Sequence, residues 1–269
     1  MALANTVRQP AVADRFYPGE AAPLQSLMDG LFSAAEAPSD AAPKAVIAPH
    51  AGFLFSGAVA ATAYRQLEPA AGRIERVVIL GPAHFHPVRG LAAHSARRFA
   101  TPLGDMAVDE EAMATVLERP DVGIDDRAHA REHSLETQLP FIRHVLGEVR
   151  IVPLVVGEAS PEAVAEILEG LWGGPETAIV ISSDLSHFHP DRQARRLDRA
   201  TAEAVERLDG EALGPQNACG FLPIGGLLGN VRRRAGRVQT LALRTSADAG
   251  APADRVVGYG AFSYREARA

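Results

Sequence analysis

The chain has 269 residues, 47% of them hydrophobic, so it can bury a large core, and its length suits one domain (1–269) better than two small ones. The net charge of -6 argues against the concentrated positive charge with which proteins bind nucleic acid or anionic membranes. One cysteine excludes an intrachain disulfide framework, no run approaches the roughly 20 apolar residues of a membrane span, and the N-terminus lacks a signal-peptide layout, so we expect a cytoplasmic protein.

Hydrophobic periodicity and turn signals predict strands alternating with helices. After an N-terminal lead containing Phe-Tyr-Pro-Gly, we expect a helix, an Ala/Pro/Ser linker, a strand and a second helix at 21–34, 35–43, 44–48 and 57–67. A strand and two helices follow at 76–80, 109–118 and 132–146, and then a strand, a helix, a strand and a helix at 150–156, 161–171, 177–183 and 191–208. The tail holds a helix and two strands, which could pair antiparallel at a sheet edge, at 222–234, 237–245 and 256–264. This alternation predicts an α/β fold with a mainly parallel central sheet and helices on both faces.

Three apolar runs each lead to a histidine. His50 follows Ala-Val-Ile-Ala-Pro, His84 follows Val-Val-Ile-Leu-Gly-Pro-Ala, and His187 follows Ala-Ile-Val-Ile-Ser-Ser-Asp-Leu-Ser. Such short, β-branched runs are typical of buried strands, and ligands bind at the carboxyl ends of strands in open α/β sheets. Packing gives no reason to place three imidazoles there, so the pattern predicts a metal or catalytic site. For each histidine taken singly, a hydrogen-bonded structural role is the alternative.

Polar residues near these histidines extend the candidate site. Asp184 lies three residues before His187, where its carboxylate could orient the imidazole or bind a metal directly. His133 is expected in the first turn of a predicted helix, with Glu136 on the same face. Glu132 and Glu136 could instead simply favour the helix N-terminus.

The single cysteine, Cys219, precedes an apolar run that we interpret as the start of a helix. That position lowers the pKa of a thiol and favours thiolate, although a lone cysteine is more often a small core hydrophobe. The sequence has no phosphate loop, dinucleotide glycine fingerprint, His-Glu-x-x-His, Cys-x-x-Cys or Gly-x-Ser-x-Gly motif. With these motifs absent, the remaining candidate is a mononuclear, histidine-rich site with one possible sulfur ligand. Two histidines plus one anionic ligand are typical of non-haem iron enzymes.

Five motifs, in this order and spacing, resemble the Memo family, whose bacterial and archaeal members are called AmmeMemoRadiSam system protein B. The resemblance covers nearly the whole chain, from Phe-Tyr-Pro near the N-terminus to the final Gly-Tyr-Gly-Ala. The motifs are Ala48-Pro-His-Ala-Gly52, Leu80-Gly-Pro-Ala-His84, Glu132-His-Ser-Leu-Glu136, Ser182-Ser-Asp184 and Cys219-Gly220.

The resemblance implies a fold similar to that of class III extradiol dioxygenases, which use iron(II) to open catechol rings, and it implies binding of iron or copper. By that resemblance His50, His84 and Cys219 would be the metal ligands. His187 matches the histidine near the metal, and Asp184 and His133 would complete the pocket. The dioxygenases supply a carboxylate as third ligand, whereas a thiolate is softer and shifts preference towards copper(I), zinc or redox-active iron.

Two functions follow from these expectations. The first is a dioxygenase-like oxidoreductase with iron(II) as the favoured metal and copper or zinc as alternatives, in which His187, oriented by Asp184, acts as general acid or base. The second is an adaptor that binds metal, a peptide or a small molecule without turnover, and the family name implies radical-SAM and AMMECR-type protein partners. A zinc hydrolase is a third hypothesis, since three ligands and an open coordination position also suit hydrolysis.

Overall fold

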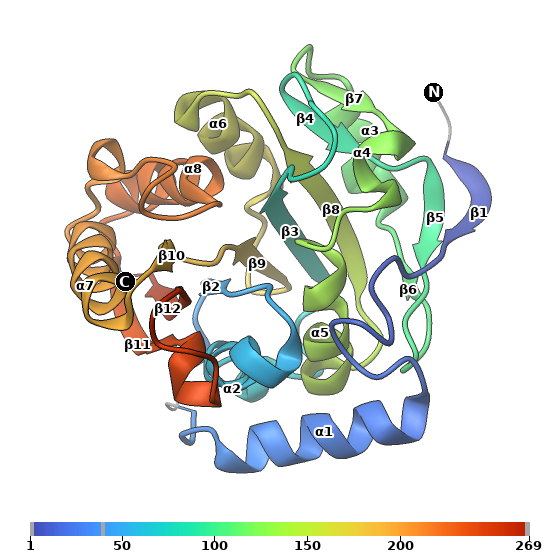
Figure 1. Cartoon of the computed structure of the whole chain (residues 1–269). Coiled ribbons are helices and arrows are strands. Elements are labelled where there is room, and N and C mark those ends of the chain that lie inside the picture. Colours follow the sequence, from blue (N-terminus) through green and yellow to red (C-terminus); the bar gives the residue numbers. More distant parts are fainter. Residues whose placement is uncertain (1–2, 39–40, 267–269) are drawn as a thin grey trace.

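The computed structural model describes residues 3–38 and 41–266, which form one α/β unit around a single hydrophobic core (Figure 1). Its main sheet has the order β10-β12-β2-β9-β3-β8-β4-β7, with β11 paired to β12. The bounds, in that order and ending with β11, are His187–His189, Val256–Arg265, Ala45–Ala48, Thr177–Ser182, Arg76–Pro82, Arg150–Val156, Leu91–Ala93, Val122–Ile124 and Arg237–Thr245.

The four central strands, β2, β9, β3 and β8, are parallel to one another, as expected. They consist mainly of Val, Ile, Leu and Ala, and nearly every residue in them is buried, which is typical of parallel strands covered on both faces. Antiparallel pairs flank this centre: β12 lies antiparallel to β2, β10 and β11, and β4 lies antiparallel to β8. The predicted antiparallel pairing of the last two strands is confirmed.

Helices cover both faces of this sheet, also as expected (Figure 1). On one face, α2 packs on β2, β11 and β12, and α1 and α5 pack on α2. On the other, α8 packs on β3 and β9, α7 packs on β11 and β12, and α6 lies against α8. These helices are α1, α2, α5, α6, α7 and α8, at Ala21–Ala34, Phe53–Arg65, Leu139–Leu146, Pro161–Leu171, Asp191–Glu206 and Phe221–Arg233.

Several short elements were not predicted. A small second sheet, β1-β5-β6, lies beside the main one, and two short helices accompany it; the bounds of β1, β5, β6, α3 and α4 are Ala4–Arg8, Ala96–Phe99, Met106–Ala107, Glu110–Leu117 and Asp126–Ala130. Of these only α3 had been expected. Part of the predicted linker, residues 39–40, lies outside the described residues.

The predicted helix at 132–146 is wrong in its first part, because helical structure begins only with the 3-10 turn Glu136–Gln138 and continues as α5. The Glu132 carboxylate accepts the backbone N–H groups of His133 and Ser134, and this local turn competes with helix formation. His133 therefore lies in a loop, and Glu136 does not share a helical face with it.

The topology brings several chain segments to the carboxyl end of the parallel strands. His50 follows β2, His84 follows β3 and Asp184 follows β9, each two residues beyond the end of its strand. Among the described residues, no helix combines the length and apolarity needed to cross a membrane.

Candidate metal centre

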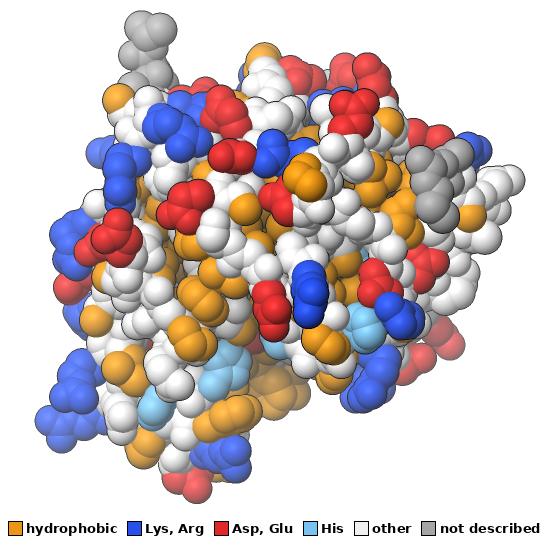
Figure 2. Space-filling model, turned by 90° about the horizontal axis from the view of Figure 1, so that it is seen from above, with side chains coloured by type: hydrophobic (Ala, Val, Ile, Leu, Met, Phe, Trp, Pro, Cys, Tyr) orange, Lys and Arg blue, Asp and Glu red, His pale blue; other side chains and the backbone are white. Residues whose placement is uncertain are grey.

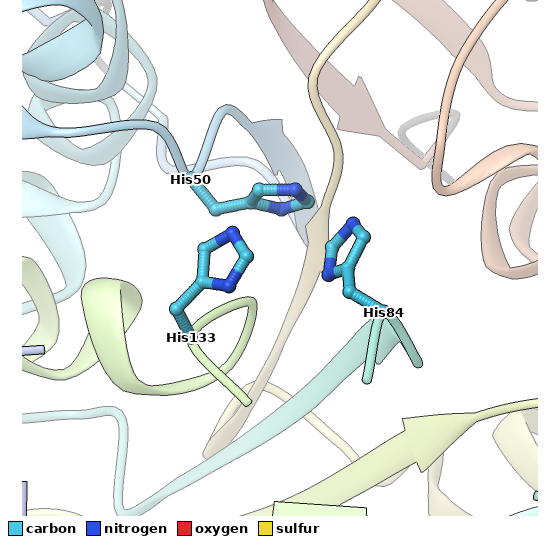
Figure 3. Close-up of side chains that lie close together, drawn as sticks. All are labelled: His50, His84 and His133. Carbon is cyan, nitrogen blue, oxygen red and sulfur yellow. The ribbon is translucent and has the colours of Figure 1, made fainter. Parts of the chain in front are cut away.

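Three imidazoles converge where these segments meet (Figure 3). Nitrogen atoms of His50, His84 and His133 all lie within 4.8 Å of one another, so the group could hold a metal ion. The ring centroids of His84 and His133 are 4.8 Å apart and nearly stacked, and the His50 ring stands edge-on to both at 5.1 and 5.3 Å. Two of the three residues were predicted as ligands, and His133 was placed in the pocket.

His50 is held from both sides and is 1% exposed. Its backbone N–H donates to Asp184 Oδ1 at 2.8 Å, and its Nδ1 lies 2.8 Å from Ser182 Oγ. Burial, reinforced by the neighbouring His84, lowers the pKa of His50 well below its ordinary value, so the imidazole is uncharged. An uncharged imidazole is the form that binds a metal.

His84 is held by a carboxylate that had not been predicted as part of the site. Glu132 Oε1 lies 2.9 Å from His84 Nδ1, and Oε2 accepts the His84 backbone N–H at 2.6 Å. Burial alone would raise the pKa of Glu132, but hydrogen bonds from His84 and from the backbone of Ser134 lower it to about 2. The ionised carboxylate accepts a hydrogen bond from the Nδ1–H of His84, which leaves Nε2 free for a metal, as in carboxylate–histidine–metal arrangements.

His133 carries a buried nitrogen without a hydrogen-bond partner. Its Nδ1 lies 3.5 Å from Glu132 Oε1, but no hydrogen bond satisfies it. Burial, followed by the influence of His50, lowers the pKa of His133 to about 4, and Phe16 packs on the ring at 4.9 Å between centroids. Because buried polar groups are nearly always paired, an orphaned imidazole nitrogen within this cluster is consistent with a ligand position.

Cys219 lies beside His50, with Sγ 3.3 Å from Nε2, and it accepts the backbone N–H of Asp184 at 3.3 Å. It does not join the three-histidine group. The expectation of a lowered thiol pKa is wrong for the metal-free chain: burial, together with the charge of Asp184, raises the pKa of Cys219 to about 12. Burial in apolar surroundings outweighs the position just before α8.

Asp184 and His187 lie next to this cluster. Asp184 is buried, and its Oδ2 lies 3.9 Å from His50 Nε2. Burial raises the pKa of Asp184, although the His50 backbone hydrogen bond opposes the shift. His187 is half-buried at the start of β10, three residues beyond Asp184. Within residues 3–38 and 41–266, Asp184 hydrogen-bonds to His50 and not to His187.

A cavity of about 220 Å³ opens next to Cys219. Apolar side chains from the loop after β3, from the end of β8 and from the start of α8 form most of its wall, including Pro82, Val88, Val156 and Leu222. Figure 2 shows histidine side chains reaching the surface among hydrophobic side chains, with charges of both signs scattered over the same face. Cys219 is among the residues that line the cavity.

The donor set fits a divalent transition metal. It combines imidazole nitrogens with a thiol and a carboxylate, and burial raises the pKa of both of these acidic groups in the metal-free chain. A bound cation would offset the cost of burying a charge there by stabilising thiolate or carboxylate. It would also give a partner to the unpaired nitrogen of His133. Imidazole suits iron, copper and zinc alike, so the residues do not select one of the three.

Known proteins are similar to this chain over most of its length. The family described as "Memo-like protein" matches residues 8–263. A MEMO1 family protein of Aquifex aeolicus is 38% identical over 211 residues, covering 77% of each chain. MEMO1 family proteins of Methanopyrus kandleri and Desulfurococcus amylolyticus are 34% and 31% identical, over 96% of this chain and 99% and 98% of theirs.

Proposed function

The chain belongs to the Memo family, and we propose that it holds one metal ion at the histidine cluster and uses it in a dioxygenase-like oxidation. The observation that carries the proposal is the convergence of three imidazoles at the carboxyl end of a parallel sheet. Burial lowers the pKa of two of them, His50 and His133, and so favours the uncharged form that binds a metal. Iron(II) is the metal we favour, with copper or zinc as alternatives.

The ligand set in this proposal is His50, His84 and one further donor. Cys219 is the donor that the family resemblance implies, and its sulfur is 3.3 Å from His50 Nε2. His133 is the competing donor, because its nitrogen lies within 4.8 Å of those of His50 and His84. Iron(II), when bound, would supply redox chemistry and an open coordination position.

The remaining residues would bind, orient and move protons. Glu132 fixes His84, and Asp184 fixes the backbone of His50. His187 is assigned the acid or base role, since it lies at the start of β10, three residues beyond Asp184, and outside the three-histidine group. The apolar cavity beside Cys219 would exclude water from a small substrate.

The test is oxygen uptake by anaerobically iron(II)-loaded protein, with catechol as the probe that the resemblance suggests. His187→Ala should lower uptake by about 10²- to 10⁴-fold, the usual contribution of a positioned acid or base, while iron content stays at the wild-type level. Unchanged oxygen uptake in the variant would remove His187 from the mechanism. Absence of uptake by the wild-type protein with a range of phenolic probes would count against a dioxygenase-like oxidation.

Exposed hydrophobic side chains favour an adaptor as the second candidate. Phe85 and Phe188, each next to a site histidine, are 49% and 59% exposed, and Leu54 near the start of α2 is 76% exposed. Such side chains suit binding of a protein partner, for which the family resemblance suggests radical-SAM and AMMECR-type proteins, or of a peptide. If this function is correct, metal-free and metal-loaded protein should bind the partner equally well in a titration; a large loss on metal removal would contradict a purely adaptor role.

A further inference from the structure

A buried chain of hydrogen bonds runs behind His50 and links three other parts of the fold. Tyr64 on α2 donates its hydroxyl proton to Gln138 Oε1 at 2.8 Å. Gln138 Nε2 donates to Pro49 O and to Ser182 Oγ, both at 3.0 Å, and Ser182 Oγ lies 2.8 Å from His50 Nδ1. The side chains of this chain are all at most 1% exposed, so water does not compete for their hydrogen bonds.

Backbone carbonyls fix the direction of every bond in this chain. A carbonyl can only accept, so Pro49 O requires the NH₂ of Gln138 on its side, and the amide oxygen must then face the Tyr64 hydroxyl. Ser182 has a single hydroxyl proton, and it donates that proton to the carbonyl of Ser134. Both lone pairs of Ser182 Oγ are thus left to accept, one from Gln138 and one from His50.

From this directionality we infer that Ser182 and Gln138 are positioning residues, which lock neutral His50 in the tautomer with its proton on Nδ1. The lone pair of the imidazole is then on Nε2, the atom that lies 3.3 Å from Cys219 Sγ. The opposite tautomer would set a bare Nδ1 against an oxygen that has no proton left to donate.

The consequence for metal binding rests on the function proposed above. His50 and His84 would both present Nε2, but one is oriented by an uncharged hydroxyl and the other by the Glu132 carboxylate. A carboxylate raises the basicity of its histidine, whereas a neutral hydroxyl does so less. The two imidazoles are therefore inequivalent ligands. Removal of the Ser182 hydroxyl should lower the metal affinity through its effect on His50 alone.

The tautomer can be measured without any metal. Long-range ¹H–¹⁵N correlation spectra of the full chain, labelled with ¹⁵N, freed of metal by a chelator and held well above the ordinary pKa of histidine, distinguish a protonated Nδ1 from a protonated Nε2. His50→Gln identifies the signals of this residue by their loss. We expect wild-type His50 to carry its proton on Nδ1, and a spectrum showing Nε2–H would overturn the inference whether or not the protein binds iron.

Two serine variants then test the positioning role. Ser182→Ala should shift His50 towards the Nε2–H tautomer and lower iron(II) affinity about 10- to 100-fold, the usual effect of losing a group that orients a ligand. Ser183→Ala is the matched control for the tautomer. This equally buried neighbour bonds to the Asp184 carbonyl and the Gly220 N–H and lies 3.9 Å from Cys219 Sγ, but it makes no hydrogen bond to His50, whose tautomer should be unchanged.

The outcomes separate this inference from the function proposed above. An unaltered tautomer, or unaltered iron affinity, in Ser182→Ala would overturn the positioning role. An Nδ1–H tautomer in a wild-type protein that binds no metal would support the locked tautomer and contradict the metal-dependent function. If Ser182→Ala does not fold, the wild-type spectrum alone still decides the tautomer.

Discussion

The two ends of the parallel sheet bury polar groups in opposite ways. At the amino end, the single lysine, Lys44, precedes β2 and donates its three ammonium protons to the carbonyls of Gly173, Gly174 and Thr177 at 3.4, 2.7 and 2.7 Å. Burial lowers the pKa of Lys44 to about 8, which still leaves the ammonium form at neutral pH. Every donor of this group has an acceptor.

At the carboxyl end, the buried groups are left partly unsatisfied. His133 Nδ1 has no hydrogen-bond partner, and burial holds Cys219 and Asp184 towards their neutral forms. Lys44 is half-buried with all its donors paired, whereas the carboxyl end holds a buried imidazole nitrogen, His133 Nδ1, that has no partner and belongs to a group of three histidines. An unsatisfied buried group costs about 1–3 kcal/mol, and a ligand bound at the three-histidine group could remove that cost for His133.

The most direct test of this difference between the two ends is to remove one polar group from each. His50→Ala should abolish stoichiometric iron(II) binding, because it deletes the imidazole at the centre of the cluster. Lys44→Met should leave iron binding intact and lower the free energy of unfolding by about 0.5–1.5 kcal/mol, since the exposed carbonyl of Gly174 and the partly buried one of Thr177 lose their donor. Calorimetric iron titrations and denaturant melts of both variants check this, and equal iron loss in the two would contradict a site confined to the carboxyl end.

A second comparison lies within one motif, between Glu132 and Glu136. Glu132 holds His84, whereas Glu136 is bound by Arg8 at 2.8 Å and by the Tyr17 hydroxyl at 2.8 Å and fastens the N-terminal lead. Glu132→Gln should lower the affinity for iron(II) about 10- to 100-fold. Glu136→Gln should leave iron affinity unchanged but lower the free energy of unfolding by about 3–5 kcal/mol, because Arg8 loses its buried partner.

Measuring iron affinity and unfolding for this matched pair would show whether only one glutamate serves the metal. A loss of affinity in Glu136→Gln comparable to that in Glu132→Gln would mean that the affinity reports general destabilisation.

The choice of third ligand can be read from proton release. Because the pKa of Cys219 is about 12 in the metal-free chain, its thiol must lose a proton to bind a metal, so binding near neutral pH should release about one proton. His50 and His133, whose pKa values are lowered by burial, release none. Calorimetric titrations in buffers of different ionisation enthalpy measure this number; Cys219→Ser should reduce it, and release near zero in wild type would assign the third position to His133.

A pH dependence of stability is also expected in the metal-free protein. Burial lowers the pKa of His133 from 6.5 to about 4, so between these values the unfolded chain binds a proton that the folded chain excludes. The free energy of unfolding should therefore fall as pH decreases through this window, by at most about 1.4 kcal/mol per unit, and this contribution should be flat above it. His133→Gln should reduce the slope in denaturant melts, and an unchanged slope would show that His133 is protonated equally in both states.

Strand-end histidines were predictable because alternating buried strands fix where their carboxyl ends meet. The positions of His50, His84 and Asp184 follow from β2, β3 and β9, whose sequences are continuous apolar runs. Glu132 could not be placed, because its function depends on a loop that replaces a predicted helical turn and on contact with His84, 48 residues away. The thiol pKa of Cys219 was predicted in the wrong direction because sequence showed the helix start but not the burial.

The central claim, that the carboxyl end of the sheet holds one metal ion, is tested most directly by elemental analysis of anaerobically purified wild-type protein after iron(II) loading and removal of free metal. We predict close to one iron atom per chain. Little or no bound iron, copper or zinc after loading with each in turn would contradict the account, and would turn attention to the exposed Phe85 and Phe188 as a surface for protein partners.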